Sequence, residues 1–95
     1  MAKRRHVFRE GDAFRSLFFI RSGSIKSYQT LESGEEQVTG FHFPGEVLGF
    51  DGISDSTHRN AAVAMETTSV CEIPFRRLFA EHGNAAAMEQ RFLSL

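Results

Sequence analysis

Hydrophobic residues occur in short runs along the first half of the chain, and a glycine stands between each run and the next. These glycines, Gly11, Gly23, Gly34 and Gly45, follow one another at intervals of 12, 11 and 11 residues. Turn signals at that spacing are typical of an all-β sandwich or barrel. The pattern therefore predicts several short strands in one small β domain.

The segments between the glycines have the composition of strands, with aromatic and β-branched side chains. The three predicted strands cover residues 17–20 (LFFI), 24–30 and 37–43. Ser22-Gly23 predicts a tight hairpin turn after the first of them. Residues 32–35 (ESGE) predict a second, more exposed turn.

The hydrophobic phase slips within the third predicted strand, and Gly40 at the slip predicts a β-bulge. Residues 46–50 (EVLGF) are compatible with a single helical turn, and the polar residues 51–60 predict a loop. Apolar residues alternate with smaller or polar ones over residues 61–65 and 71–73, which predicts two further strands. The alanine-rich run 61–65 is also compatible with a helix, but it is too short to be stable as an isolated one.

Helical spacing replaces the strand pattern after Pro74. A short helix is expected to end at Gly83, because glycine is a frequent helix C-terminal residue. Asn84 is a candidate cap for a second helix. Its apolar face would consist of Ala85, Met88, Phe92 and Leu95.

Composition narrows the class of protein. The chain has 95 residues, 41% of them hydrophobic, and a net charge of −1, which fits one domain and argues against nucleic-acid binding by bulk charge. A single cysteine, Cys71, excludes an internal disulfide framework and suits a reducing compartment. No apolar run approaches the ~18 residues of a membrane span, and the first residues lack the apolar stretch of a signal peptide. The expected location is the cytoplasm, with no membrane partner.

Charge is distributed unevenly. Residues 1–26 carry seven basic and two acidic side chains, and residues 27–58 carry six acidic side chains and no lysine or arginine. Residues 59–95 balance at four and four. The acidic middle segment is either a partner surface or an ordinary solvated face.

The residues offer little for catalysis. There is no Gly-x-Ser-x-Gly motif, and the glycines after Pro44 match neither a dinucleotide-binding nor a P-loop fingerprint. The good donors for transition metals include no pair at i, i+2 or i, i+4; they are His6, His42, His58, His82 and Cys71. We therefore expect neither an enzyme nor a self-contained metal site.

Four residues form a weak signal for a nucleotide-binding site. The carboxylate of Glu46, after Gly45, can accept a ribose hydroxyl, and Arg59, before Asn60, can bind a phosphate through two hydrogen bonds. The alternative is a surface loop with incidental charges.

Three longer stretches resemble the CRP/FNR family of transcription regulators, in particular its oxygen-sensing FNR branch. They are residues 20–28 (IRSGSIKSY), 38–51 (VTGFHFPGEVLGFD) and 70–75 (VCEIPF). The resemblance covers about residues 7–82. It implies a mainly β fold: a cyclic-nucleotide-binding-like double-stranded β-helix (jelly roll) with short flanking helices. It also implies a tail at residues 1–6, and at residues 83–95 the start of a C-terminal helix leading to a dimerisation helix beyond the chain.

The resemblance implies a role for Cys71. In the FNR branch four thiolates hold a [4Fe–4S] cluster, and Cys71 maps onto the fourth of them. The three N-terminal cysteines of the family pattern are absent here, as is the DNA-reading domain. The expected protein is therefore the sensor domain of an oxygen- or redox-responsive regulator. The full-length parent would form a homodimer, hold the cluster and bind DNA, whereas this chain alone would bind no DNA and assemble no stable cluster.

Two further expectations follow from the same resemblance. The predicted exposed turn would belong to a surface that contacts RNA polymerase; its residues are Glu32, Ser33, Gly34, Glu35 and Glu36. The alternative function is a regulatory domain that binds cyclic AMP or cyclic GMP through Gly45, Glu46, Arg59 and Asn60. Against it, the spacing from Glu46 to Arg59 is longer than in nucleotide-binding members, and Asn60 replaces the usual Ser or Thr.

Overall fold

The computed structural model describes residues 1–76, so the two helices predicted after Pro74 lie almost entirely outside the described residues. Seven strands and one short 3-10 helix make up the described part of the chain. The elements are β1 (His6–Phe8), β2 (Ser16–Ser22), β3 (Ile25–Thr30), β4 (Glu36–His42), β5 (Val47–Leu48), η1 (Phe50–Gly52), β6 (Ala61–Ala64) and β7 (Ser69–Pro74).

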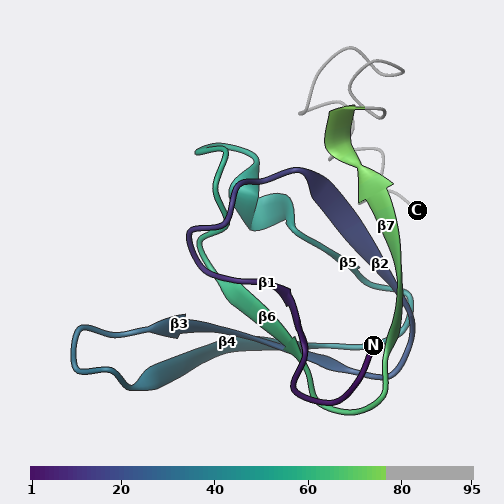
Figure 1. The fold of residues 1–95 in the computed structure, drawn as a ribbon, viewed down its shortest axis with the longest axis horizontal. Helices are drawn as coiled ribbons and strands as arrows, with labels where there is room; N and C mark the ends of the chain where they lie inside the picture. The colour runs from purple at the N-terminus through teal and green to yellow at the C-terminus, as the bar shows by residue number, and fades with distance from the viewer. Residues whose placement is uncertain (77–95) are drawn as a thin grey trace.

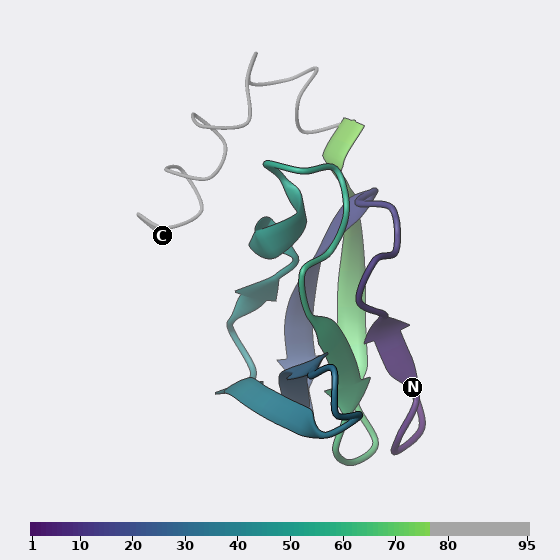
Figure 2. The same ribbon diagram turned by 90° about the vertical axis from the view of Figure 1, so that its left-hand side faces the viewer.

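The strands form two antiparallel sheets. One sheet has the order β1-β6-β3-β4 and the other the order β5-β2-β7 (Figures 1 and 2). Neighbours in the sheets are mostly distant in sequence, which gives the crossed connections of a jelly roll. The prediction of a mainly β jelly roll is confirmed.

The core lies between the two sheets and is small. Its buried cluster consists of Phe8, Ile20, Ile25, Leu48 and Ala62. Leucine and isoleucine side chains that are fully withdrawn from water contribute about 1.5–3 kcal/mol each. These five residues come from β1, β2, β3, β5 and β6, so the core joins both sheets.

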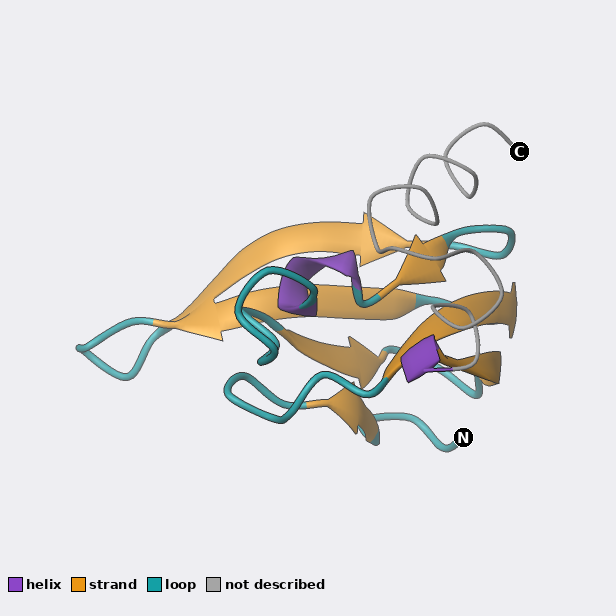
Figure 3. Cartoon of the chain, turned by 90° about the horizontal axis from the view of Figure 1, so that it is seen from above, coloured by secondary structure: helices purple, strands orange, loops and turns teal. Residues whose placement is uncertain are grey.

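The β3–β4 hairpin extends away from the body as a long arm (Figures 1 and 3). Within it, Ser27 pairs with Gly40 while the next residue, Tyr28, pairs with Val38. One residue of β4, Thr39, is therefore unpaired, and the β-bulge predicted at Gly40 is confirmed. The exposed turn predicted for residues 32–35 is also confirmed as the tip of this hairpin.

The hairpin turn predicted at Ser22-Gly23 is wrong. β2 pairs with β5 and β7, whereas β3 pairs with β4 and β6, so the chain crosses from one sheet to the other at this point. Gly23 has a φ of +90°, and a Cβ there would lie 2.3 Å from the Thr68 Oγ1 atom. The glycine is required by this close approach at a corner between sheets.

The helical turn predicted for residues 46–50 lies a few residues later in the structure than predicted. Val47 and Leu48 form β5, and the 3-10 turn begins later, at Phe50. The reason is tertiary: the backbone of Ile20 donates to the Glu46 carbonyl and accepts from the Gly45 amide, at 3.0 and 2.9 Å. These bonds hold the segment against β2 as a strand.

The first residues are paired with the body of the domain. The backbone of Arg4 donates to the Ala64 carbonyl, and the amide of Ala64 donates to the Arg5 carbonyl. β1, which the sequence analysis did not predict, follows directly and pairs with β6. Within residues 1–76, no helix has the length and apolar character that a membrane span requires.

Candidate functional site

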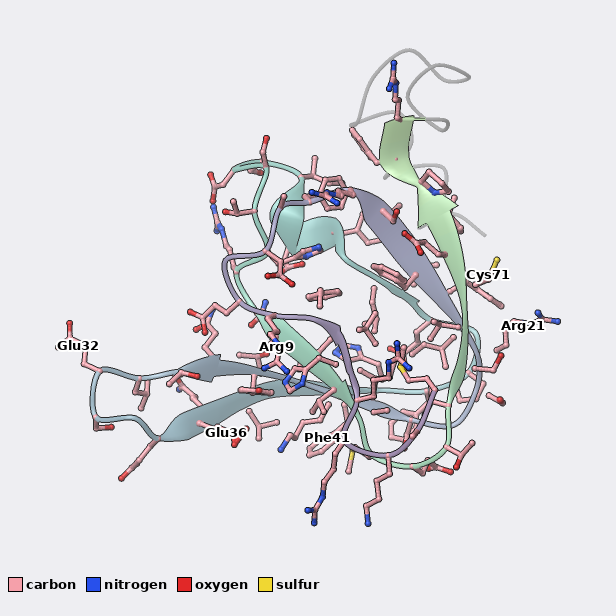
Figure 4. All side chains as sticks on the ribbon, viewed as in Figure 1. Arg9, Arg21, Glu32, Glu36, Phe41 and Cys71 are labelled. Atoms are coloured by element: carbon pink, nitrogen blue, oxygen red, sulfur yellow. The ribbon has the colours of Figure 1, made fainter. Side chains whose placement is uncertain are left out.

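Cys71 lies on β7, directly opposite Phe19 of β2. Its thiol is exposed, and it projects from the outer side of the sheet in Figure 4. Sequence parity alone left open whether Cys71 faced solvent or core. The structure resolves this, because Val70 takes the inward position and packs against the core cluster.

The neighbours of Cys71 along the strand, half-buried Val70 and exposed Glu72, both contact other parts of the domain. Glu72 accepts a hydrogen bond of 2.7 Å from the Ser16 hydroxyl of β2. Val70, through its packing on the core cluster, and Glu72, through its bond to buried Ser16, therefore hold β7 against the domain on both sides of the exposed thiol. A ligand held at Cys71 would act on a strand whose inward residues belong to the core.

Cys71 is the right type of ligand for an iron–sulfur cluster, but a single thiolate is too few to hold one. An exposed thiol is accessible to iron, and an iron–sulfur cluster requires about four thiolates. Among the described residues, no group of three or more His, Cys, Asp or Glu side chains could hold a metal ion. Cys71 can therefore supply one ligand, and the rest would have to come from outside this sequence.

The candidate nucleotide residues are engaged with other partners. The carboxylate of Glu46 accepts a short hydrogen bond from the Phe43 amide and lies 3.6 Å from the His42 Nδ1 atom. The guanidinium of Arg59 pairs with the Asp55 carboxylate at 2.7 Å, exposed to solvent. Glu46 and Arg59 are thus held by their own local turns.

The cavity beside these residues is small. Its volume is about 190 Å³. Asn60 lines it, but Gly45, Glu46 and Arg59 do not. The structure therefore does not bring the four predicted nucleotide-binding residues together around one cavity.

Asp51 is a polar residue of this region to which the sequence analysis assigned no role. Its carboxylate accepts hydrogen bonds from the backbone amides of Arg59 and Asn60, at 2.8 and 2.9 Å, and from the Asn60 side chain at 3.2 Å. It also lies 3.1 Å from the His58 Nδ1 atom. No local motif signals this contact, because Asp51 and His58 are separated by a polar loop with no repeating pattern.

The acidic residues of the β3–β4 hairpin differ in environment. Glu32 lies at the tip, far from Cys71, and Glu36 lies at the start of β4 (Figure 4). Glu36 pairs with Lys26 of β3 at 3.7 Å. Residues 32–36 are all exposed, so the tip offers free carboxylates at Glu32 and Glu35 while Glu36 is partly neutralised.

Comparison with known sequences finds one matching family model and several related regulators. Residues 1–82 match the family model of the cyclic nucleotide-binding domain. The chain is 48% identical over 93 residues to Electron transport regulator A of Shewanella oneidensis, with 98% of this chain and 37% of that protein covered. It is 50% identical over 78 residues to the Transcriptional activator protein anr of Pseudomonas aeruginosa (82% and 32% covered). It is 46% identical over 89 residues to the Fumarate and nitrate reduction regulatory protein of Escherichia coli (94% and 36% covered).

Solved structures show the same fold. The chain superposes on FixK2 from Bradyrhizobium japonicum with a TM-score of 0.83 and 27% identity, covering 98% of this chain and 46% of that one. The sensor domain of the transcriptional regulator DNR from Pseudomonas aeruginosa gives a TM-score of 0.85 at 14% identity, covering 99% and 64%. The chain spans about a third of the length of the curated relatives that it matches.

Proposed function

Since the chain belongs to the CRP/FNR family of cyclic nucleotide-binding domains, and its close curated relatives are regulators, we propose that it is the sensor domain of an FNR-type, oxygen-responsive regulator. The observation that carries this proposal is the exposed Cys71 thiol on β7, in a chain 46–50% identical to anaerobic and FNR-named regulators.

Cys71 would be one thiolate ligand of a [4Fe–4S] cluster in the full-length protein. When bound, such a cluster supplies oxygen-labile redox chemistry. The protein itself positions the ligand: β7 exposes the Cys71 thiol to solvent, and the contacts of Val70 and Glu72 hold the strand on both sides of Cys71. Three further thiolates would come from outside this sequence, so this chain alone is expected to hold no stable cluster.

The signal would travel through β7. Val70 packs against the core cluster and Glu72 is hydrogen-bonded to Ser16, so a change at Cys71 strains contacts inside the domain. In the proposed mechanism this alters dimerisation and hence DNA binding, which is a coupling between separate sites. The parent would be a cytoplasmic homodimer that binds DNA and RNA polymerase.

A chimera tests the proposal without the native parent. In Electron transport regulator A, the matched segment is replaced by this chain, and the protein is reconstituted anaerobically with iron and sulfide. We expect a visible absorbance that oxygen bleaches, lost in Cys71→Ser. An absorbance that survives Cys71→Ser would overturn the assignment of the thiol.

Ser69→Ala provides the matched control, because Ser69 is also exposed and lies on the same strand two residues away. It should leave the absorbance and the thermal stability unchanged. DNA binding by the chimera is read in parallel by gel shift. The isolated 95-residue chain should give neither a shift nor an absorbance.

The alternative, binding of cyclic AMP or cyclic GMP, gains no support from the contacts. Arg59 is paired with Asp55, Glu46 is bonded to its own turn, and the adjoining cavity of about 190 Å³ is below the range of roughly 300–1,000 Å³ that is usual for ligand pockets. We therefore do not propose it as a second function.

A further inference from the structure

Hydrogen-bond donors from three consecutive residues converge on one carboxylate near the inner cavity. The Asp51 Oδ2 atom accepts the backbone amides of Arg59 and Asn60 and the side-chain amide of Asn60. The Asp51 Oδ1 atom faces the His58 Nδ1 atom at 3.1 Å. The segment 58–60 thus surrounds both oxygens of a single anionic group.

The His58 and Asp51 side chains are largely withdrawn from water. The side chain of His58 is 2% exposed and that of Asp51 is 19% exposed. The His58 ring stacks on Phe8 of the core, with ring centroids 3.7 Å apart and planes inclined by 11°. Since Nδ1 faces a carboxylate, this nitrogen carries the proton and acts as a donor.

Four convergent donors of this kind suit an oxyanion. Consecutive backbone amides, a side-chain amide and an imidazole N–H make charge-assisted hydrogen bonds to carboxylate or phosphate oxygens alike. In this chain the anion is internal, because Asp51 comes from η1, seven to nine residues before its donors. These hydrogen-bond donors of residues 58–60 therefore have a partner without any external ligand.

Other polar side chains at and beside the cavity also form hydrogen bonds with one another. The Asn60 Oδ1 atom accepts from the Thr39 hydroxyl at 3.0 Å, and the oxygen of that hydroxyl also lies 3.0 Å from the Ser27 hydroxyl oxygen. Ser27 is in turn 2.9 Å from the His42 Nε2 atom. In the described part of the chain, no buried side-chain nitrogen or oxygen lacks a partner.

We propose that Asp51 is a built-in anion that occupies the oxyanion-binding segment 58–60 and excludes phosphate-bearing ligands from it. The carboxylate holds the segment in the conformation that a bound phosphate would otherwise stabilise. Removing it converts the segment into a binding site for phosphate. This inference does not depend on Cys71 or on a cluster.

The test uses the full chain and inorganic phosphate, with chloride at matched ionic strength as the reference. Phosphate stabilises folded proteins weakly without binding to a site, so the rise in the wild-type melting temperature in phosphate measures this general effect, and each variant is judged by its rise beyond it. Asp51→Ala should melt at a lower temperature than wild type in chloride and should recover progressively as phosphate is added, because a ligand that binds only the folded state raises the melting temperature.

Asp12→Asn is the matched control. Asp12 also accepts a backbone amide, from Arg9, at 2.9 Å, but it does so in a different loop. Its loss should lower stability without creating a response to phosphate larger than that of wild type. A folded Asp51→Ala protein that phosphate does not stabilise would overturn the proposal, as would an equal phosphate response in Asp12→Asn.

A second measurement needs no variant. In wild-type protein at neutral pH, the amide resonances of Arg59 and Asn60 should not shift on addition of phosphate or cyclic AMP, because their hydrogen bonds are taken by Asp51. Saturable shifts of both amides would show donors open to an external anion and would overturn the proposal. If Asp51→Ala does not fold, Asp51→Ser, whose side chain is too short to occupy the segment, is melted in the same two salts and judged by the same outcomes.

Discussion

At the scale of single residues, glycines with similar backbone angles have very different surroundings. Gly23 and Gly34 have φ values of +90° and +91°. A Cβ on Gly34 would meet nothing within 4 Å, whereas a Cβ on Gly23 would lie 2.3 Å from Thr68 Oγ1 and 2.7 Å from the Thr67 carbonyl. The first is needed only for its conformation, and the second for conformation and space together.

Replacing these two glycines by alanine separates the two effects. Gly34→Ala should lower the free energy of unfolding by about 1 kcal/mol, the cost of a left-handed backbone. Gly23→Ala should cost that amount plus about 1–3 kcal/mol for overpacking against Thr67 and Thr68. Urea denaturation of both variants measures the difference, and equal losses would refute the close approach at the corner.

A second prediction at this scale concerns His6. Partial burial, followed by the charge of Arg9, lowers the pKa of His6 below its usual value of 6.5. The unfolded chain then binds the proton more readily than the folded one. The stability contributed by neutral His6 is therefore fully present above pH 6.5 and is lost as the pH falls through the lowered pKa.

Chemical denaturation between about pH 7.5 and about pH 5 tests this in wild type and in His6→Gln. The variant should lose less stability on acidification than wild type does. Nearby charges on Asp12, Lys26 and Glu36 are the same in both proteins, so they cancel in the comparison. An identical pH profile in the two proteins would contradict the lowered pKa.

At the scale of elements, the β3–β4 hairpin joins a core-bound base to an exposed tip. At the base, Ile25 of β3 is fully buried in the core. At the tip, the amide of Gly34 donates to the Leu31 carbonyl and the amide of Leu31 to the Glu35 carbonyl, which fixes the turn. Because the Glu32 and Glu35 side chains are exposed and lie away from the core, we expect their replacement to leave the fold unchanged.

The proposed contact with RNA polymerase can be tested at that tip. In the chimera described above, Glu32→Lys combined with Glu35→Lys should reduce transcription activation while leaving DNA binding unchanged. Glu36 is left intact because it pairs with Lys26. Unaltered transcription would remove the tip from the contact surface, and weaker DNA binding would point to a structural effect instead.

At the scale of the whole molecule, a set of polar side chains beside the hydrophobic core is already hydrogen-bonded. A continuous chain of contacts runs from η1 to the end of β4, through Asp51, Asn60, Thr39, Ser27 and His42. A nucleotide would have to break these contacts and enlarge the cavity. Within residues 1–76, the fold of a nucleotide-binding domain therefore has its predicted nucleotide residues engaged with other partners.

Calorimetric titration of the chain with cyclic AMP and cyclic GMP should accordingly give no heat beyond dilution. The same result is expected for Arg59→Ala, since that guanidinium is exposed and paired with Asp55. Micromolar binding that disappears in Arg59→Ala would contradict this reading. It would establish a nucleotide sensor and reduce Cys71 to a surface residue.

Much of the fold was predictable because strands and turns leave local signals. The runs 17–20, 24–30 and 37–43, the Gly34 turn and the bulge at Gly40 all matched the structure. β1 was missed because three residues are too few to show alternation. The turn at Gly23 was misassigned because a hairpin and a corner between sheets use the same glycine conformation.

The sequence by itself determined the fold class, the family and the motif around Cys71, because these depend on periodicity and on runs of identical residues. Only the tertiary structure decided that Cys71 is exposed, that β2 and β3 lie in different sheets, and that Arg59 pairs with Asp55. It also decided that Asp51 holds the segment 58–60. The physical reason is that burial, partner choice and convergence of donors are set by residues far apart in the sequence, which no local pattern records.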